Sequence, residues 1–281
     1  MSLQAMQEYT YKSKYSQYIS EKNRRENWAE TVDRFCDMFL KYYSDKPDVF
    51  KYVERVRRSM KKKRILGSQR GLQFGGDPIL KKHARIYNCT ASYVDRPRFF
   101  QECMYLLMAG SGVGFSVQRH HIDCLPNIVK SVGKKTFVID DSIEGWSDAI
   151  GQIVTSYFEG YDNSNVEFDY SQIREKGSRL SSCSGKAPGP EPLKIAIEKI
   201  RSLINSALES GQEKLRPIQA YDIIMHSADA VLSGGIRRCV AKGSRVQTCH
   251  DGYKKIEDIV IGDLVSTMNG WKSVTNTFVQ G

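Results

Sequence analysis

The sequence predicts a mixed α/β protein in which helices come first, strands and helices then alternate, and a small all-β segment ends the chain. Apolar residues recur at the i, i+3, i+4 spacing of an amphipathic helix over residues 26–43 and again over 98–108. Short apolar runs over 136–139 and 166–170 are typical of strands. Beyond residue 244, Asp-Gly and Asn-Gly pairs separate short apolar runs, which predicts β-hairpins.

Length and composition limit the class of protein. With 281 residues, 40% of them hydrophobic, the chain can bury one large core or two modest ones. No apolar run reaches the ~18 residues that a membrane-spanning helix needs, and the first residues lack the basic-then-apolar order of a signal peptide. We therefore expect a cytoplasmic protein. The net charge of +10 favours a phosphate-bearing partner, either a nucleotide or a nucleic acid.

The cysteines indicate thiols that stay reduced. All seven, at positions 36, 89, 103, 124, 183, 239 and 249, lie at unrelated spacings, with neither a disulfide framework nor a Cys-x-x-Cys metal motif. Reduced thiols suit the cytoplasm. His120, His121 and Cys124 lie close together, but no further ligand follows at metal-site spacing, so we expect a polar loop and no metal site.

The first quarter of the chain is expected to be helical. The amphipathic pattern over 26–43 places Cys36 in the core, and Pro47 begins a second helix that carries the basic run 57–64. That run is either a solvated helix face or a nucleic-acid-binding segment. We favour the solvated face, because no interleaved aromatic residues offer bases a stacking surface. Residues 67–78, with four glycines and Arg70, predict a loop.

The stretch from Ile86 to Phe115 sets one cysteine, Cys89, beside a glycine turn at 110–114. A strand-like approach to Cys89 and the helix over 98–108 bring the thiol and the turn to one end of a βαβ unit, where α/β folds place their chemistry. Glycines at 110, 112 and 114 let backbone amides approach a ligand. The alternative for a lone cysteine is a small buried hydrophobe, which is our interpretation of Cys103.

The remaining elements follow in order. A strand over 136–139 leads to an acidic turn and a helix that runs to about Tyr157, with a serine in the position of a helix cap. A strand over 166–170 precedes a basic, glycine-rich loop over 174–190, of the kind that closes over phosphates. Helices are expected over 191–209 and 217–232.

Three motifs together resemble the large chain of ribonucleotide reductases, most closely the adenosylcobalamin-dependent, class II enzymes. They are Tyr87-Asn-Cys89, Leu107-Met-Ala-Gly-Ser-Gly-Val-Gly-Phe115 and Asp141-Ser-Ile-Glu-Gly-Trp-Ser-Asp-Ala149. The resemblance implies a helical region over 1–85, the first half of an α/β barrel over 86–238, a ribonucleotide substrate and a thioredoxin-like reductant. It also implies adenosylcobalamin as cofactor, with most of the cofactor's contacts lying beyond Gly281.

The resemblance also assigns candidate residues. In that family the cysteine of Asn-Cys, here Cys89, is one of two thiols that reduce the 2' position of the substrate, while a thiyl radical forms in the other half of the barrel. The implied ribose-pocket residues are Asn88, Ser111, Gly112 and Gly114. The loops over 174–190 and 233–238 resemble specificity loops, which respond to a deoxynucleotide effector. The effector-side candidates are Asp141, Ser142, Arg174, Arg179, Gly234, Gly235 and Arg237.

The resemblance to a reductase ends at Arg238. From Cys239 onward the sequence resembles the N-terminal part of an intein over 239–281, which implies that Cys239 attacks the carbonyl of Arg238 to form a thioester. The alternative is a structural cysteine. No Thr-x-x-His segment and no terminal His-Asn lie in 239–281, so we expect that the chain cannot splice alone and is the front half of a split intein precursor or a truncated one. The expected partner is a second polypeptide with the rest of the intein and the C-terminal reductase half.

Two other functions stay open. As the main alternative, the chain is a nucleotide- or nucleic-acid-binding module that acts through its basic face and has no reductase activity. In a third hypothesis, splicing is the chain's own activity.

Overall fold

The computed structural model describes residues 2–178, 187–232, 245–249, 252–255, 258–267 and 270–274. The chain divides into two compact units, Met1–Ile236 and Arg237–Gly281. Within the described residues, no helix combines the length and the apolar character needed to span a bilayer.

The first unit begins with three helices. These are α1 (Leu3–Lys14), α2 (Trp28–Tyr42) and α3 (Pro47–Lys61), and a two-stranded hairpin of β1 (Tyr18–Ile19) and β2 (Arg24–Arg25) around η1 (Ser20–Lys22) joins the first two. A capping box starts α2, since Asn27 and Glu30 each accept the backbone N–H of the other. The predicted helices over 26–43 and from Pro47 are confirmed, and Cys36 is buried.

A buried ion pair ties the N-terminal segments together. Arg34 on α2 donates to both carboxylate oxygens of Glu26, from Nε to Oε1 at 2.6 Å and from Nη2 to Oε2 at 2.9 Å. The same guanidinium donates to the carbonyl oxygens of Leu72 and Gly75, each at 2.9 Å. The Arg34 side chain therefore connects the β2–α2 junction to the segment around Leu72 and Gly75; Gly75 lies 41 residues after Arg34 in the sequence.

The prediction of a loop over 67–78 is wrong. The segment contains α4 (Gln69–Phe74) and the start of α5 (Asp77–Lys81), and η2 (His83–Ile86) follows. Ser68 caps α4 by accepting the Gly71 N–H at 3.2 Å. Gly71 allows α4 to pack closely against Phe35 on α2, because a Cβ on Gly71 would lie 2.3 Å from Cε2 of Phe35. Leu72 and Phe74 complete the buried cluster of this region.

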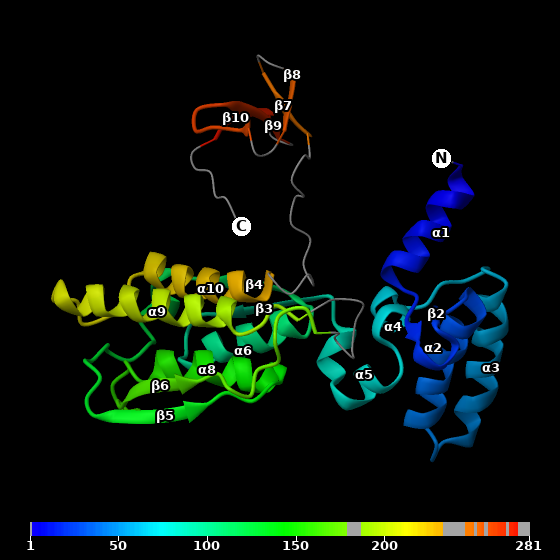
Figure 1. Ribbon diagram of the computed structural model, residues 1–281, viewed down its shortest axis with the longest axis horizontal. Helices are drawn as coiled ribbons and strands as arrows, with labels where there is room; N and C mark the ends of the chain where they lie inside the picture. The colour runs from blue at the N-terminus through cyan, green and yellow to red at the C-terminus, as the bar shows by residue number, and fades with distance from the viewer. Residues whose placement is uncertain are drawn as a thin grey trace. The chain divides into compact units, whose positions relative to one another are not determined.

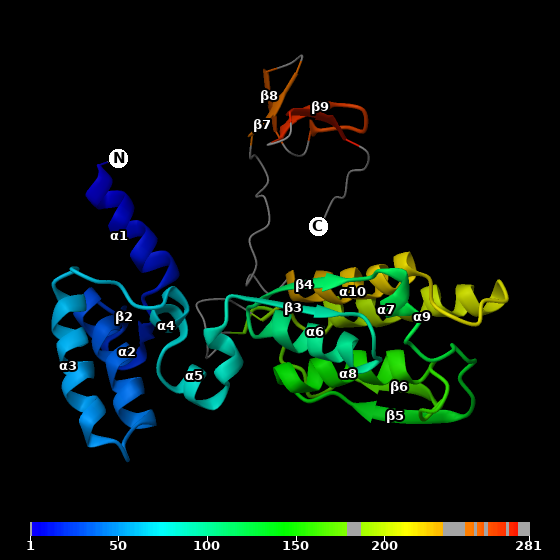
Figure 2. The same cartoon turned by 180° about the vertical axis from the view of Figure 1, so that it is seen from behind.

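The rest of the first unit alternates strands and helices. Its elements are β3 (Cys89–Tyr93), α6 (Arg98–Met108), β4 (Gly112–Ser116), α7 (Arg119–Ile122), β5 (Lys134–Val138), α8 (Ile143–Thr155), β6 (Asn165–Asp169), α9 (Glu191–Glu209) and α10 (Pro217–Leu232). α6 packs against α8 and α10, and α9 lies along α10 (Figures 1 and 2). Their facing side chains form a second buried cluster, which includes Phe99, Cys103, Ile150 and Ile197. The mixed α/β fold class is confirmed.

The strands of this part form two separate parallel pairs within the described residues. In the first pair Cys89 lies opposite Gly112 and Tyr93 opposite Ser116. In the second pair Lys134 lies opposite Asn165 and Val138 opposite Asp169. Each pair is joined through a helix, α6 in the first and α8 in the second, which is the βαβ connection that parallel strands require.

The second unit is a small antiparallel sheet. Its strands are β7 (Arg245–Thr248), β8 (Gly252–Lys255), β9 (Leu264–Thr267) and β10 (Gly270–Ser273), in the order β10-β9-β7-β8. β7 pairs antiparallel with β8, and β9 with β10, which is the pairing predicted for these segments; Asp251 and Asn269 themselves lie outside the described residues. The strand expected over 259–267 covers only 264–267, because Gly262, at φ +96°, ends a turn just before it.

Candidate functional site

The thiol of Cys89 and the glycine turn meet at one end of the β3–α6–β4 unit, as predicted. The end itself differs from the prediction. Cys89 is the first residue of β3 and lies in register with Gly112, the first residue of β4. Both therefore lie at the amino ends of the parallel strands, whereas α/β folds usually bind ligands at the carboxyl ends. The segment before Cys89 is η2 followed by Tyr87 and Asn88, not a strand.

The glycine turn is the C-terminal cap of α6. Gly110 adopts φ +96°, a left-handed conformation that favours glycine. Its N–H donates to the Leu107 carbonyl at 3.0 Å, and the Ser111 N–H donates to the Leu106 carbonyl at 2.9 Å. These two bonds form a Schellman motif. The turn directs the chain straight into β4, so that Gly112 arrives beside Cys89.

The thiol is exposed, and its polar neighbour is Asn88, the residue just before β3. Cys89 is exposed, and its Sγ accepts a hydrogen bond from Nδ2 of Asn88 at 3.4 Å. The backbone of Asn88 is fixed as well, because its carbonyl accepts the Gly112 N–H at 2.8 Å. A Cβ on Gly112 would lie 4.0 Å from Sγ. Gly112 therefore lies beside the thiol, and a side chain there would be in van der Waals contact with the sulfur.

The other two predicted ribose-pocket residues differ in exposure. Ser111 is fully buried, and its hydroxyl donates to the Tyr87 carbonyl at 2.9 Å. Its side chain thus supports the 87–89 segment from inside the fold. Gly114 is exposed on β4, and a Cβ there would lie 3.7 Å from the Thr90 carbonyl oxygen, an ordinary contact.

Arg70 also reaches this site, although the sequence places it in a predicted loop. From α4, its Nε donates to Oδ1 of Asn88 at 3.2 Å, and its Nη2 donates to the Gly110 carbonyl. The guanidinium of Arg70 also lies over the ring of Phe74, with its central carbon 5.6 Å from the ring centroid. The sequence signal that could have placed Arg70 on a helix is Ser68, a cap two residues before it.

Three of the predicted effector-side residues come together at the start of α8. Ser142 caps the helix by accepting the Gly145 N–H at 3.0 Å. Arg174, just after β6, pairs with Asp141 from Nε to Oδ2 at 2.6 Å. Gly145 allows the tight turn, since a Cβ there would lie 2.2 Å from the Asp140 carbonyl oxygen.

Several predicted residues lie outside the residues that the structure describes. They are Arg179, Gly234, Gly235, Arg237, Arg238 and Cys239. The splice junction and most of the two predicted specificity loops are among them.

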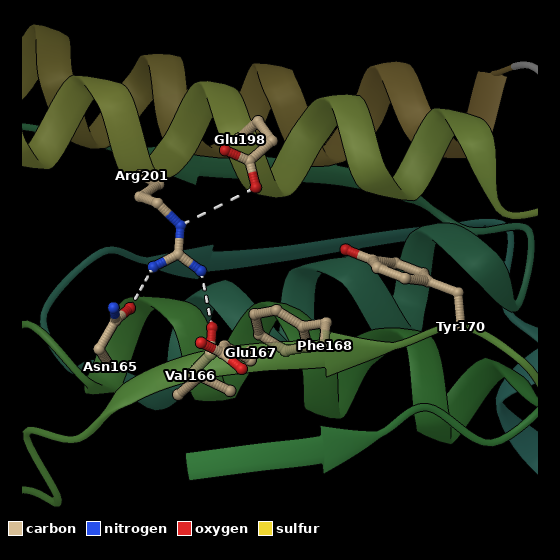
Figure 3. Close-up of a pocket in the computed structure, with 7 residues that line it drawn as sticks. All are labelled: Asn165, Val166, Glu167, Phe168, Tyr170, Glu198 and Arg201. Atoms are coloured by element: carbon tan, nitrogen blue, oxygen red, sulfur yellow. Dashed lines mark hydrogen bonds and ion pairs between the residues drawn. The ribbon is translucent and has the colours of Figure 1, made fainter. Parts of the chain in front are cut away.

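A hollow of about 380 Å³ lies elsewhere, between β6 and α9. Arg201 reaches from α9 to β6, where it donates to Oδ1 of Asn165 at 2.6 Å and to the Val166 carbonyl at 2.7 Å (Figure 3). Tyr170 lies at the other end of the hollow, and burial raises the pKa of its hydroxyl to about 12. None of the residues that line this hollow is a predicted site residue.

The other described thiols divide into buried and exposed ones. Cys36 and Cys103 are buried, and burial raises the pKa of the Cys36 thiol to about 11. Cys124 is exposed and donates to the His120 carbonyl at 3.3 Å. Among the residues that the structure describes, no three His, Cys, Asp or Glu side chains are placed to hold a metal ion.

No protein-family model matches the chain. The chain is similar to curated enzymes named adenosylcobalamin-dependent ribonucleoside-triphosphate reductase. It is 32% identical to the enzyme of Euglena gracilis over 186 residues, which cover 62% of this chain and 24% of that protein. It is 25% identical to the enzyme of Lactobacillus gasseri over 297 aligned positions, which cover 82% of this chain and 40% of that protein.

The fold has a counterpart among solved structures. A crystal structure of a B12-dependent, class II ribonucleotide reductase matches with a TM-score of 0.71 at 22% identity, and the match covers 80% of this chain and 40% of that one. The chain thus spans two-fifths or less of the proteins that it matches. It is similar in sequence to adenosylcobalamin-dependent ribonucleoside-triphosphate reductases and shares its fold with part of a class II ribonucleotide reductase.

Proposed function

We propose that residues 1–238 are the N-terminal half of a cytoplasmic, adenosylcobalamin-dependent ribonucleotide reductase and hold half of its α/β barrel. The observation that carries the proposal is the exposed thiol of Cys89, which lies in register with Gly112, a residue that places no side chain against the sulfur. The names of the similar enzymes supply the substrate class, a ribonucleoside triphosphate.

The proposed chemistry at Cys89 is a two-electron reduction. Cys89 and a second cysteine of the other half each give up one proton and one electron and join in a disulfide. The ribose 2'-hydroxyl leaves as water and a hydrogen takes its place. A thioredoxin-like dithiol then reduces the disulfide by thiolate exchange, so an accessible thiol is needed. The exposure of Cys89 meets that requirement.

Gly112 and Asn88 would fix the sugar beside the thiol. Gly112 would let the sugar approach the thiol, because it places no side chain against the sulfur, and the exposed amide of Asn88 offers hydrogen-bonding groups. Ser111 would act indirectly, since its hydroxyl holds the Tyr87 carbonyl. Gly114, exposed two residues further along β4, would let the backbone of that strand face the substrate.

The described residues do not fit adenosylcobalamin. The hollow between β6 and α9, at about 380 Å³, has the size of a site for a small ligand, and a corrinoid is far larger. Its lining residues include no thiol. When bound in the complete enzyme, the cofactor would supply the radical, and its binding residues would come from the other half.

We further propose that Asp141, Ser142 and Arg174 belong to a deoxynucleotide effector site, with Arg179, Gly234, Gly235 and Arg237 contributed by the two loops. The ion pair between Arg174 and Asp141 supports this, because it places a guanidinium, a phosphate-binding group, at the start of α8. Helix N-termini also favour anions.

For the C-terminal segment we propose the front part of an intein that begins at Cys239. Two observations support it. The boundary between the two compact units falls in the sequence between Ile236 and Arg237, two residues before Cys239. The described strands of the second unit form an antiparallel sheet, in which β7 pairs with β8 and β9 with β10. The rest of the intein and the C-terminal reductase half would come from a second polypeptide, and splicing would join the two reductase halves.

The reductase proposal is tested by co-expression with a C-terminal partner fragment. The ligated product should form deoxynucleotides with thioredoxin, and Cys89→Ser should abolish this activity. Cys124→Ser is the matched control, since Cys124 is also an exposed free thiol. If the ligated Cys89→Ser protein reduces ribonucleotides at the wild-type rate, Cys89 does not carry the reaction.

The intein proposal has its own test. With the missing intein part supplied, added thiol should release a fragment of residues 1–238, and Cys239→Ala should prevent the release. Release at an unchanged rate from the Cys239→Ala variant would refute the role of Cys239. The main alternative function, nucleic-acid binding, predicts instead tight, salt-sensitive binding of DNA that deoxynucleotides do not compete away.

A further inference from the structure

A chain of hydrogen bonds leads from α4 to the Cys89 thiol. Arg70 donates from Nε to Oδ1 of Asn88 at 3.2 Å, and Asn88 donates from Nδ2 to Sγ of Cys89 at 3.4 Å. The first donor belongs to the N-terminal helical region, and the last acceptor opens β3. The two regions are therefore linked directly at the predicted reactive group.

The guanidinium decides which way the Asn88 amide faces. Arginine has five N–H donors and no acceptor, so the amide atom beside it must be the oxygen. The NH₂ group of the amide is then turned to the sulfur. Asn88 is itself exposed, so water would otherwise compete for both ends of the amide.

Arg70 also holds the other side of the site. Its Nη2 donates to the carbonyl of Gly110, directly after the C-terminus of α6, where a positive charge is favourable. Asn88 and Gly110 flank the paired residues Cys89 and Gly112. One planar guanidinium thus fixes both segments, a geometry that a lysine ammonium cannot reproduce.

From these contacts we infer that Arg70 is a positioning residue for the Cys89 thiol. By fixing the Asn88 amide, it keeps an N–H donor on the sulfur. Donors to sulfur stabilise the thiolate, which is the form that attacks and exchanges. The inference rests on the proposed function only where it assigns a catalytic role to a reactive Cys89 thiol.

The test measures the reactivity of Cys89 in the 281-residue chain itself. Iodoacetamide alkylation at pH 7.5 is followed for each cysteine-containing peptide by mass spectrometry. Arg70→Met should slow alkylation of Cys89 about three- to tenfold, the effect of one lost hydrogen bond. Cys124, exposed and remote in sequence, should react at an unchanged rate.

A double-mutant cycle separates positioning from a general charge effect. If Arg70 acts through the amide, Arg70→Met should have no further effect in an Asn88→Ala background, and Arg70→Lys should restore the rate only in part. If the two effects instead multiply, or Arg70→Lys restores the rate fully, the guanidinium acts by its charge alone and the inference fails. An unchanged Cys89 rate in Arg70→Met also overturns it.

Two further variants keep the test decisive. Gln73→Ala is the matched control, because Gln73 accepts from Nη1 of Arg70 at 3.4 Å but lies outside the chain of bonds to the thiol. The buried Cys36 and Cys103 report folding. If Cys36 or Cys103 becomes reactive in Arg70→Met, that variant is misfolded. The Arg70→Lys variant, with and without Asn88→Ala, then replaces it in the double-mutant cycle. The reactivity result holds whether or not Cys89 proves catalytic in the ligated enzyme, so the two failures are distinguishable.

Discussion

Replacing Arg34 by methionine should open the N-terminal hydrophobic cluster while leaving the second cluster closed. The side chains of Arg34 and Glu26 are only 15% and 6% exposed. Removing one partner of a buried pair leaves the other charge uncompensated, which costs about 3–5 kcal/mol. Since 1.4 kcal/mol is about a factor of ten, the population of the locally open state should rise on the order of 10²- to 10³-fold.

Each cluster contains its own buried cysteine, which makes the effect measurable region by region. Cys36 lies in the N-terminal cluster and Cys103 in the second. When opening and closing are fast, alkylation of a buried thiol follows the open population. In Arg34→Met, alkylation of Cys36 should therefore accelerate on the order of 10²-fold or more, whereas the rate for Cys103 should stay unchanged.

A matched control comes from an exposed ion pair of the same region. Lys41 and Asp77 are 3.3 Å apart, with side chains 70% and 67% exposed. Such pairs contribute about 0–1 kcal/mol, so Lys41→Met should change the Cys36 rate less than about fivefold. The reasoning is refuted if Arg34→Met has an effect as small as this control, or if Cys103 accelerates together with Cys36.

Three further substitutions follow from the geometry. Gly112→Ala should slow alkylation of Cys89, because the added methyl would lie 4.0 Å from the sulfur, and an unchanged rate would show that the space beside the thiol is not its route of access. Gly145→Ala should weaken deoxynucleotide binding measured by calorimetry, since its Cβ would lie 2.2 Å from the Asp140 carbonyl oxygen and displace the start of α8. For Cys36 the pKa is about 11 in the folded chain against a usual 9.0, so the unfolded state loses its proton first and stability falls as pH rises from 9 to 11. Urea unfolding followed by tryptophan fluorescence should show a smaller fall in Cys36→Ala.

The long helices were predictable because their signals are local. Apolar spacing defines α2 and α6, and Pro47 and Pro217 begin α3 and α10. Proline at the first helical position costs no hydrogen bond and sets the helical φ, so the sequence marks these starts directly. The hairpins at Asp-Gly and Asn-Gly were predictable for the same reason.

The segment over 67–78 was not predictable from glycine content. Glycine breaks helices through backbone entropy, a cost of about 1 kcal/mol each. At Gly71 that cost is offset by contact with Phe35, a residue on another helix. Whether a glycine marks a loop or a close helix contact therefore depends on a partner more than thirty residues away, which no local pattern reveals.

The sequence also did not predict that Cys89 lies at the amino end of the parallel strands. Cys89 lies near Gly112 because the connecting helix is long enough to return the chain to the side of β3. The choice of end depends on where β3 begins, and η2 postpones that beginning to Cys89 itself. The general rule for α/β folds predicted the carboxyl ends, and the structure has the thiol at the amino end.

The position at the amino end gives the N-terminal helical region a role in the site. The amino end of β3 is the end that η2 and α4 lead into, so their side chains can reach the thiol, and Arg70 does so through Asn88. Lys82, just after α5, likewise pairs with Glu144 at the start of α8. Residues 1–85 therefore supply contacts to both candidate sites, and an experiment on residues 86–238 alone would remove the guanidinium that orients Asn88. We expect such a truncated chain to show the slow Cys89 alkylation of Arg70→Met, even where Cys103 remains protected.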